Sequence, residues 1–283
     1  MAHIRELDPS ASPLDYFGSE LRRKREEAGL KQSQLGDAIF CTGSLIGQIE
    51  TARKVPTREF AERADAALLT DGFFSRLVGL VLRSQLPHWF QPYAEMEAKA
   101  EYISTFQCQL VYGLLQTPEY AGALRVFSGL GQVEEMVAAR MERQRILNRS
   151  NPPALWVVLG EAVLLHEVGG HEVMRAQLAH LLKMQERPWL HIQVLPLTVG
   201  AHSGMRGSFT MLRFDDDPDL FYCETYDNGH MTANSKVIRE RSIGYAHLQA
   251  CALSPESSAD LITQVMEERY GEQSAAGESH NMA

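Results

Sequence analysis

Two histidines in the segment HEVGGH, residues 166–171, are the first side chains whose type and spacing suggest metal chemistry. A zinc-protease helix needs histidines at positions i and i+4 with a glutamate between them, so that both imidazoles lie on one helical turn. Here His166 and His171 are five positions apart across two glycines. This spacing favours a helix that ends near Glu167 and another that begins after Gly170. We therefore expect no metal site in this segment.

The glycine-rich segment GAHSGMRGSF, residues 200–209, is the strongest candidate for a loop that binds a ligand or a partner. Its glycines allow the backbone to approach a ligand closely, and His202, Ser203 and Arg206 offer donors to an anion. A plain connection between two strands explains the same residues, so both interpretations stay open. The acidic run FDDDPD, residues 214–219, lacks the glycine and the terminal glutamate of an EF-hand loop, which favours a solvated turn.

The remaining polar residues indicate no catalytic centre. The other histidines are scattered, and no grouping of serine, histidine and acid is apparent in the sequence. The cysteines lie far apart without a C-x-x-C pair, which argues against a disulfide framework and a structural zinc site. These are Cys41, Cys108, Cys223 and Cys251. We expect neither an enzyme nor a cofactor.

Basic clusters near the beginning of the chain suggest contact with phosphates. The 283 residues carry a formal net charge of −9, but residues 1–72 hold 10 basic and 12 acidic side chains of the 27 and 36 in the whole chain. Within this segment, RRKR (residues 22–25) and the pair Arg53 and Lys54 are concentrated patches. Local charge governs the attraction of a protein surface for DNA phosphates, so the negative net charge of the whole chain does not exclude DNA binding.

The elements that must position these patches are short helices. Apolar residues at helical spacing predict helices over Asp15–Ala28 and Gln32–Ile39, a third capped by Thr42, and a fourth that follows residues 55–57. Gly29 should stop the first helix. The second and third helices are joined by only two or three residues, which is the helix-turn-helix geometry that places the third helix in a DNA major groove.

The run LRRKREEAGLKQSQLGDAIFCTGSLIGQIETARKVPT resembles the lambda-repressor-like (XRE) family of helix-turn-helix regulators. The arginine-rich first helix, the GLxQ entry, the IxxIE recognition helix and the basic exit before proline occur in the order typical of that family. Phe40 departs from the pattern, because the family's turn usually has glycine and a bulky residue at positive φ is strained.

The resemblance implies a role for individual residues of this segment. Only Gln48 of the recognition positions has a side chain suited to a bidentate contact with adenine, although an exposed glutamine without a role is the alternative. The basic residues after the recognition helix would meet phosphates, and one ion pair would bridge the first and third helices. The DNA-binding residues implied are Gln32, Thr42, Gly43, Ser44, Gln48, Arg53 and Lys54, and the structural pair is Arg25 and Glu50.

The larger remainder predicts a second, mixed domain. A helical connection is expected where apolar residues recur at Phe73, Leu77, Leu80 and Val81. Further helices are expected over Ala94–Gln107, Pro118–Gly129, Val133–Arg149, His171–Gln185, Ser235–Ala250 and Glu256–Tyr270, with strands in ALWVVL, LHIQVLPL, GSFTMLRF and DLFYCETY. The predicted fold class is thus multi-domain, an all-α helix-turn-helix domain followed by a larger α+β domain with a short-stranded sheet. The domains predicted are a flexible arm (1–14), the helix-turn-helix domain (15–72), the helical connection and α+β domain (73–270) and a disordered tail (271–283).

Three runs in the second part, GLLQTPEYAGAL, RQRILNRSNPPALWVVLGEAVL and QVLPLTVGAHSGMRGSFTMLRF, resemble the companion domain of Scr1-like and WhiJ-like actinobacterial regulators. That resemblance covers residues 87–270 and implies transcription control, commonly beside a gene for a small partner protein. It supplies no catalytic residues.

Three functions follow from these patterns. The first is a cytoplasmic, dimeric transcriptional regulator that binds an operator in double-stranded DNA and receives a signal through its second domain. The second is an antitoxin-like protein that holds a small partner encoded by an adjacent gene and autoregulates its operon. The third, an enzyme with a DNA-binding head, has no credible centre in the sequence. No apolar run approaches the ~20 residues that span a bilayer, so we expect no membrane partner.

Overall fold

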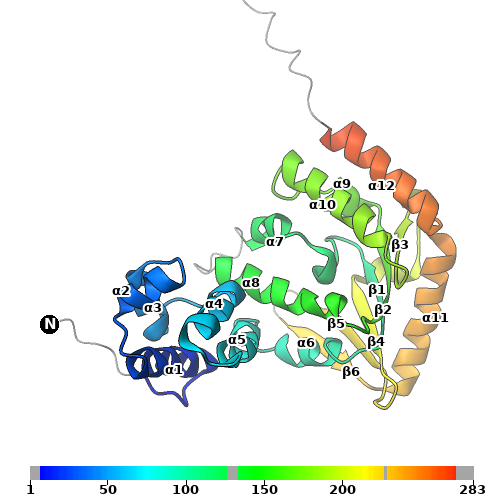
Figure 1. Ribbon diagram of the computed structural model, residues 1–283. Helices are drawn as coiled ribbons and strands as arrows, with labels where there is room; N and C mark the ends of the chain where they lie inside the picture. The colour runs from blue at the N-terminus through cyan, green and yellow to red at the C-terminus, as the bar shows by residue number, and fades with distance from the viewer. Residues whose placement is uncertain (1–6, 126–132, 226–227, 272–283) are drawn as a thin grey trace, which may run out of the picture. The chain divides into compact units, whose positions relative to one another are not determined.

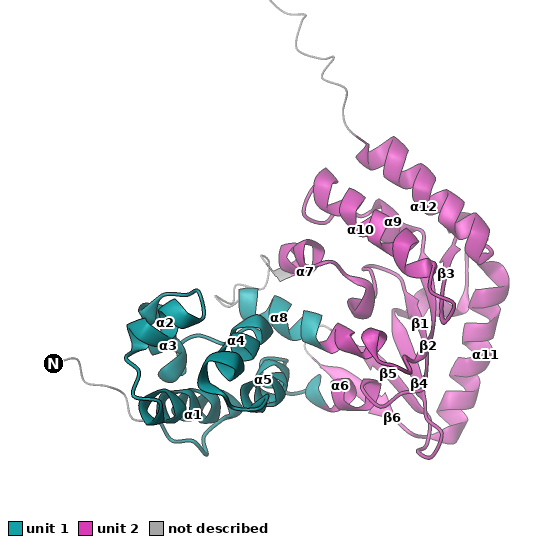
Figure 2. Cartoon of the chain, viewed as in Figure 1, with its two compact units in different colours: residues 1–91, 134–142 teal, residues 92–133, 143–283 magenta. Residues whose placement is uncertain are grey.

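The computed structural model describes residues 7–125, 133–225 and 228–271, and the chain divides into two compact units. Unit 1 comprises residues 1–91 and 134–142, and unit 2 comprises residues 92–133 and 143–283 (Figure 2). Much of the arm predicted for residues 1–14 and nearly all of the tail predicted for residues 271–283 lie outside the described residues.

Unit 1 is helical (Figure 1). Local signals begin and end its helices: Thr42 and Thr57 each accept a hydrogen bond from the backbone N–H three residues later, and Gly29 has φ 69° after the first helix. These caps confirm the helices predicted between residues 15 and 72. The helices are α1 (Pro13–Glu27), α2 (Gln32–Ala38), α3 (Gly43–Glu50), α4 (Arg58–Leu68), α5 (Phe73–Ser84) and most of α8 (Val133–Arg143).

The core of unit 1 includes helices beyond the predicted helix-turn-helix segment. Phe74, Val78 and Val81 of α5 are fully buried with the core residues of α1 to α4, and Ala138 of α8 packs against the same cluster. Asp65 of α4 accepts backbone hydrogen bonds at the start of α5, which fixes the direction of that helix. The compact unit therefore extends to residue 91, whereas the predicted boundary between the domains lies at residue 72.

Unit 2 is built on one six-stranded mixed sheet, so the predicted fold class is confirmed. The strand order is β3-β2-β1-β4-β5-β6. Strands β1, β2 and β3 pair in parallel. The pairs β1–β4, β4–β5 and β5–β6 are antiparallel. The strands are β1 (Tyr102–Gln107), β2 (Ala154–Gly160), β3 (Leu190–Leu195), β4 (Phe209–Arg213), β5 (Leu220–Glu224) and β6 (Gly229–Thr232).

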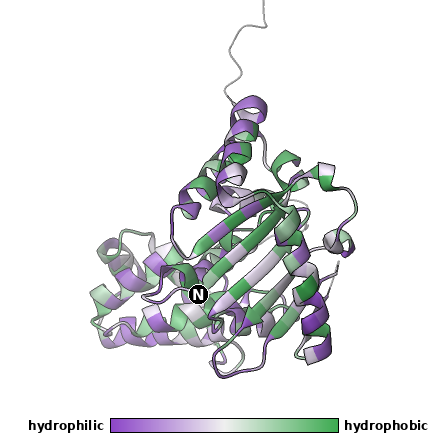
Figure 3. Ribbon diagram, turned by 90° about the vertical axis from the view of Figure 1, so that its right-hand side faces the viewer, coloured by the Kyte–Doolittle hydropathy of each residue, from purple (hydrophilic) through white to green (hydrophobic). Residues whose placement is uncertain are grey.

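Helices of unit 2 cover both faces of this sheet. Tyr245 and Leu248 of α11 pack on the face of the sheet that presents Phe221 of β5. The next residue of β5, Tyr222, faces the other side, where its ring stacks on that of Tyr93 of α6 with the ring centroids 3.9 Å apart. Figure 3 shows that hydrophobic residues are frequent along the strands. The α-helices of unit 2 are α6 (Gln91–Glu97), α7 (Pro118–Arg125), α9 (Ala162–Leu165), α10 (His171–Gln185), α11 (Ser235–Cys251) and α12 (Pro255–Tyr270).

Two helix predictions beyond residue 91 were wrong. The helix expected over Ala94–Gln107 ends at Glu97, and Tyr102–Gln107 forms the central strand β1, because its backbone pairs with β2 on one side and β4 on the other. The helix expected to continue to Arg149 is an α-helix only to Arg143 and then a 3-10 turn. The end predicted for the helix at Pro118 lies outside the described residues. In the described ranges no helix is long and apolar enough to cross a membrane.

Candidate nucleic-acid interface

Two glycines set the corner between α2 and α3. A Cβ atom on Gly36 would lie 2.7 Å from the Cys41 carbonyl oxygen, and one on Gly43 would lie 2.9 Å from Cα of Ser33. Real Cβ atoms do not approach backbone so closely, and these backbone atoms have little freedom to move. The two glycines therefore allow the close approach that positions the first turn of α3.

Phe40 occupies the turn itself. Its backbone has φ 60°, the left-handed conformation that glycine adopts freely and that costs energy for a bulky residue. The side chain is 85% exposed, and the guanidinium carbon of Arg63 lies 5.9 Å from its ring centroid. An aromatic ring therefore stands on the surface beside the α2–α3 corner.

The polar face of α3 presents two side chains suited to reading bases. Ser44 and Gln48, one helical turn apart, are exposed. Thr42 is exposed as the N-cap, and its hydroxyl accepts a hydrogen bond from the Leu45 N–H. Gly43 is half-buried against α2 and offers only its backbone.

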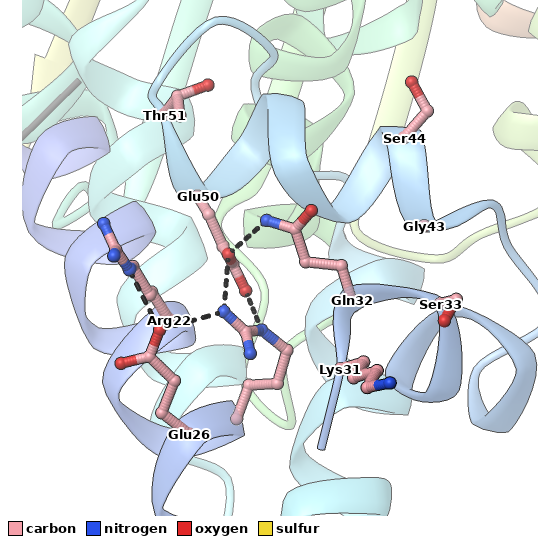
Figure 4. Close-up of a pocket in the computed structure, with 10 residues that line it drawn as sticks. Arg22, Glu26, Lys31, Gln32, Ser33, Gly43, Ser44, Glu50 and Thr51 are labelled. Carbon is pink, nitrogen blue, oxygen red and sulfur yellow. Dashed lines mark hydrogen bonds and ion pairs between the residues drawn. The ribbon is translucent and has the colours of Figure 1, made fainter. Parts of the chain in front are cut away.

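A hollow of about 570 Å³ lies beside this face, between α1, α2 and α3 (Figure 4). Gln32 and Glu50 point toward each other across it, and the Gln32 amide Nε2 donates to Glu50 Oε2 at 2.8 Å. Lys31, Ser33 and Ser44 add polar atoms to its lining. The hollow thus borders the recognition helix with groups that can meet phosphate oxygens.

An ion pair behind this hollow joins α1 to α3. Arg25 Nε donates to Glu50 Oε1 at 2.5 Å and Arg25 Nη2 donates to Oε2 at 3.1 Å, while Nη1 donates to the Leu30 carbonyl at 2.7 Å. The side chains of Arg25 and Glu50 are only 9% and 2% exposed. Hydrogen bonding to Glu50 raises the pKa of Arg25 above its ordinary value. Glu50 therefore holds both Arg25 and Gln32 in place.

The basic cluster of α1 is largely matched by carboxylates on the same helix. Arg22 pairs with Glu26 at 3.1 Å, and Arg23 pairs with Glu20 at 2.5 Å. Lys24 pairs with Glu27 at 3.0 Å. Such exposed pairs contribute little to stability, but they reduce the charge that this face offers to phosphates. Of the two basic patches, RRKR is thus the weaker candidate for gripping DNA.

The two basic residues after α3 have different surroundings. Arg53 is exposed, whereas the ammonium of Lys54 lies 2.8 Å from Glu134 Oε2 and 3.1 Å from Glu135 Oε1 of α8. Neither glutamate was predictable from the sequence, because contacts across 80 residues leave no local pattern.

Only two of the three residues predicted for a ligand loop in unit 2 line a common hollow. His202 and Ser203 line an open hollow of about 550 Å³ with His247 and Cys251, whereas Arg206 is exposed and does not line it. Ser203 Oγ donates to the Gly244 carbonyl at 2.6 Å, so its hydroxyl proton is engaged within the fold. Plain connection and ligand loop both remain compatible with this arrangement.

Metal ligation finds no support in the regions that the structure describes. The two histidines of HEVGGH have separate neighbours: His166 Nδ1 lies 3.3 Å from the Gln109 carbonyl, and His171 Nε2 lies 3.4 Å from Glu167 Oε2. Throughout residues 7–125, 133–225 and 228–271, no three His, Cys, Asp or Glu side chains are grouped to hold a metal ion.

Comparison with known protein families assigns both parts of the chain. A helix-turn-helix domain family matches residues 17–72, the segment that holds the α2–α3 corner and the exposed face of α3. A domain of unknown function, DUF5753, matches residues 90–264, more than half of the chain. No curated protein and no solved structure matches. The chain carries an N-terminal helix-turn-helix domain and belongs to the DUF5753 family.

Proposed function

We propose that this protein is a sequence-specific DNA-binding transcriptional regulator of the lambda-repressor-like type. The observation that carries the proposal is the exposed face of α3, with Ser44 and Gln48 one turn apart, set by the glycine-dependent corner of a matched helix-turn-helix domain. Base edges in the major groove are read by side chains presented in this way. Arg53 lies on the same unit as an exposed donor for phosphates. Gln32 donates to Glu50 through its amide nitrogen, which carries a second N–H for the same task. Contacts with phosphates orient the protein without reading sequence.

We also infer that the regulator works as a dimer and receives its signal through the DUF5753 domain, from a small partner protein or a ligand. Two base-reading side chains are few for a single recognition helix. A dimer would address two half-sites about 34 Å apart and so double the contact. We place this function in the cytoplasm.

A binding titration by fluorescence anisotropy tests the proposal. The full chain is titrated onto DNA from upstream of its own gene and onto scrambled DNA, with and without the small protein encoded by the adjacent gene. Preference for the native DNA, changed by the neighbour, is the expected result. Equal binding to both DNAs in every condition would contradict sequence-specific regulation by this operator.

Gln48→Ala is expected to weaken binding to the native operator by about 1–3 kcal/mol and to leave binding to scrambled DNA unchanged. The reason is that Gln48 is the longer of the two exposed polar side chains on α3 and is suited to a bidentate contact with adenine. Gln264→Ala, at an exposed glutamine of α12, is the matched control and should change neither affinity. An equal loss on both DNAs would remove the base-reading role from Gln48.

Arg53→Ala is expected to reduce the slope of log affinity against log salt by about one unit on any DNA. An exposed guanidinium directly after the recognition helix is placed to displace one counterion from the phosphate backbone. Arg239→Ala on α11 removes the same charge from an exposed arginine of unit 2 and should leave the slope unchanged. The measurement is the same titration repeated across a salt series, and an unchanged slope for Arg53→Ala rules out the phosphate contact.

A further inference from the structure

One side of α8 carries acidic side chains onto the helix-turn-helix unit. Glu135, Ala138 and Glu142 follow each other at spacings of three and four residues, so they lie on one helical face, with Glu134 beside them. Ala138 packs against the core of unit 1. This segment of α8 comes from the sequence matched by DUF5753, yet it belongs to the same compact unit as the helix-turn-helix domain.

The end of this face near Glu142 is firmly attached. Arg58 Nε donates to Glu142 Oε2 at 2.9 Å, Arg58 Nη2 donates to Oε1, and Nη1 donates to the Ser75 carbonyl at 3.1 Å. The Glu142 side chain is only 11% exposed. A bidentate pair in this setting, together with the contact of Ala138, holds α8 on unit 1 without help from Lys54.

The other end encloses Lys54 between two carboxylates. Glu134 Oε2 and Glu135 Oε1 lie 2.8 and 3.1 Å from its ammonium. Hydrogen bonding to Glu134, followed by that to Glu135, raises the pKa of Lys54, and Lys54 in turn lowers the pKa of Glu134. The Glu134 side chain is 83% exposed, so this end of the contact is open to water and easily exchanged.

Two carboxylates on one ammonium change what Lys54 presents to DNA. The group has three N–H donors, and Glu134 and Glu135 engage two of them. One positive charge flanked by two negative charges is locally negative, so it repels a phosphate at close range. Without the two glutamates, Lys54 would offer a second phosphate contact beside the exposed Arg53.

We propose that Glu134 and Glu135 compete with DNA phosphates for Lys54, so that docked α8 is an autoinhibitory contact within the regulator. The proposal rests on the proposed DNA-binding function. Movement of the Glu134 end of α8 releases Lys54 and adds one phosphate contact. Because α8 continues to Arg143, which belongs to unit 2, a signal received by the DUF5753 domain has a covalent path to this helix.

The test is a salt series of operator titrations on the full chain. The double variant Glu134→Gln/Glu135→Gln keeps the shape of both side chains and removes their charges. It should bind about fivefold more tightly at about 0.15 M salt, with a salt slope steeper by about 0.9. Lys54→Ala should cost less than twofold in the unmodified chain and about fivefold in the double variant.

A matched double variant controls for net charge. Glu267→Gln/Glu268→Gln removes two adjacent exposed carboxylates from α12 and should leave the affinity within twofold of the unmodified chain. Equal tightening by both double variants, or an equal cost of Lys54→Ala in both backgrounds, would overturn the autoinhibitory contact. If Arg53→Ala still lowers the slope in that case, DNA binding itself stands. If Arg53→Ala has no effect either, the proposed function fails and the inference fails with it.

Discussion

Glu50→Ala is expected to lower the free energy of unfolding of unit 1 by about 3–5 kcal/mol. The carboxylate is 2% exposed and receives hydrogen bonds from Arg25 and from Gln32. Its removal leaves the Arg25 guanidinium buried without the partner that offsets its loss of hydration, and this uncompensated charge dominates the cost. Because the two units need not unfold together, the measurement is hydrogen exchange of α1 and α3 peptides in increasing denaturant.

Glu26→Ala is the matched control for this prediction. Glu26 is also paired with Arg25, at 3.2 Å, but its side chain is 54% exposed. Water therefore replaces most of what the carboxylate contributes, and the expected cost is below about 1 kcal/mol. The double replacement Arg25→Met/Glu50→Leu should cost less than Glu50→Ala alone, since no charge is left buried. Similar costs for Glu50→Ala and Glu26→Ala would show that burial of the pair does not determine its contribution.

The helices of unit 1 were predictable because their signals are local. Thr42 and Thr57 are side-chain caps within three residues of the N–H they satisfy, and Gly29 ends α1 at a positive φ. Each signal is complete within one short window of sequence. The family resemblance then identified the α2–α3 corner, which the spacing of apolar residues alone leaves ambiguous.

The central strand of unit 2 was not predictable from its own residues. The segment EMEAKAE that precedes β1 favours a helix, and this preference extended the predicted helix through Gln107. The strand is decided by its neighbours: Phe106 pairs with Val158 of β2 and with Phe209 of β4, far along the chain. Tertiary pairing of this kind overrides a local helix preference.

The exposed residues of the candidate site were predictable from the sequence, but the ion pairs of its basic residues were not. Ser44, Gln48 and Arg53 are exposed where the helix-turn-helix resemblance implied. The partners of Lys54 come from residues 134 and 135 and are set by the docking of α8, which no pattern within residues 15–72 encodes. Charge partners at long sequence separation thus decide which basic side chains of this segment lie in ion pairs.

A second buried charge pair stabilises unit 2. Glu97 of α6 is fully buried, and its Oε1 accepts hydrogen bonds from the hydroxyls of Tyr93 at 2.8 Å and Tyr112 at 2.6 Å. Its Oε2 lies 3.0 Å from Arg143 Nε, at the end of α8. Burial, followed by the charge of Glu97, raises the pKa of both tyrosines well above the ordinary value, so they stay protonated and remain donors.

Glu97→Ala is therefore expected to destabilise unit 2 by about 3–5 kcal/mol, because Arg143 loses its buried counter-charge and two tyrosine hydroxyls lose their acceptor. Tyr112→Phe removes a single hydrogen bond to the carboxylate and should cost about 1.5–3 kcal/mol. Hydrogen exchange of β1 and β5 peptides in denaturant measures both variants, with the helices α1 to α3 as an internal reference. A cost for Glu97→Ala no greater than that for Tyr112→Phe would mean that the charge of Arg143 is balanced without Glu97. The larger cost would instead show that Glu97 is the counter-charge of Arg143 at the end of α8.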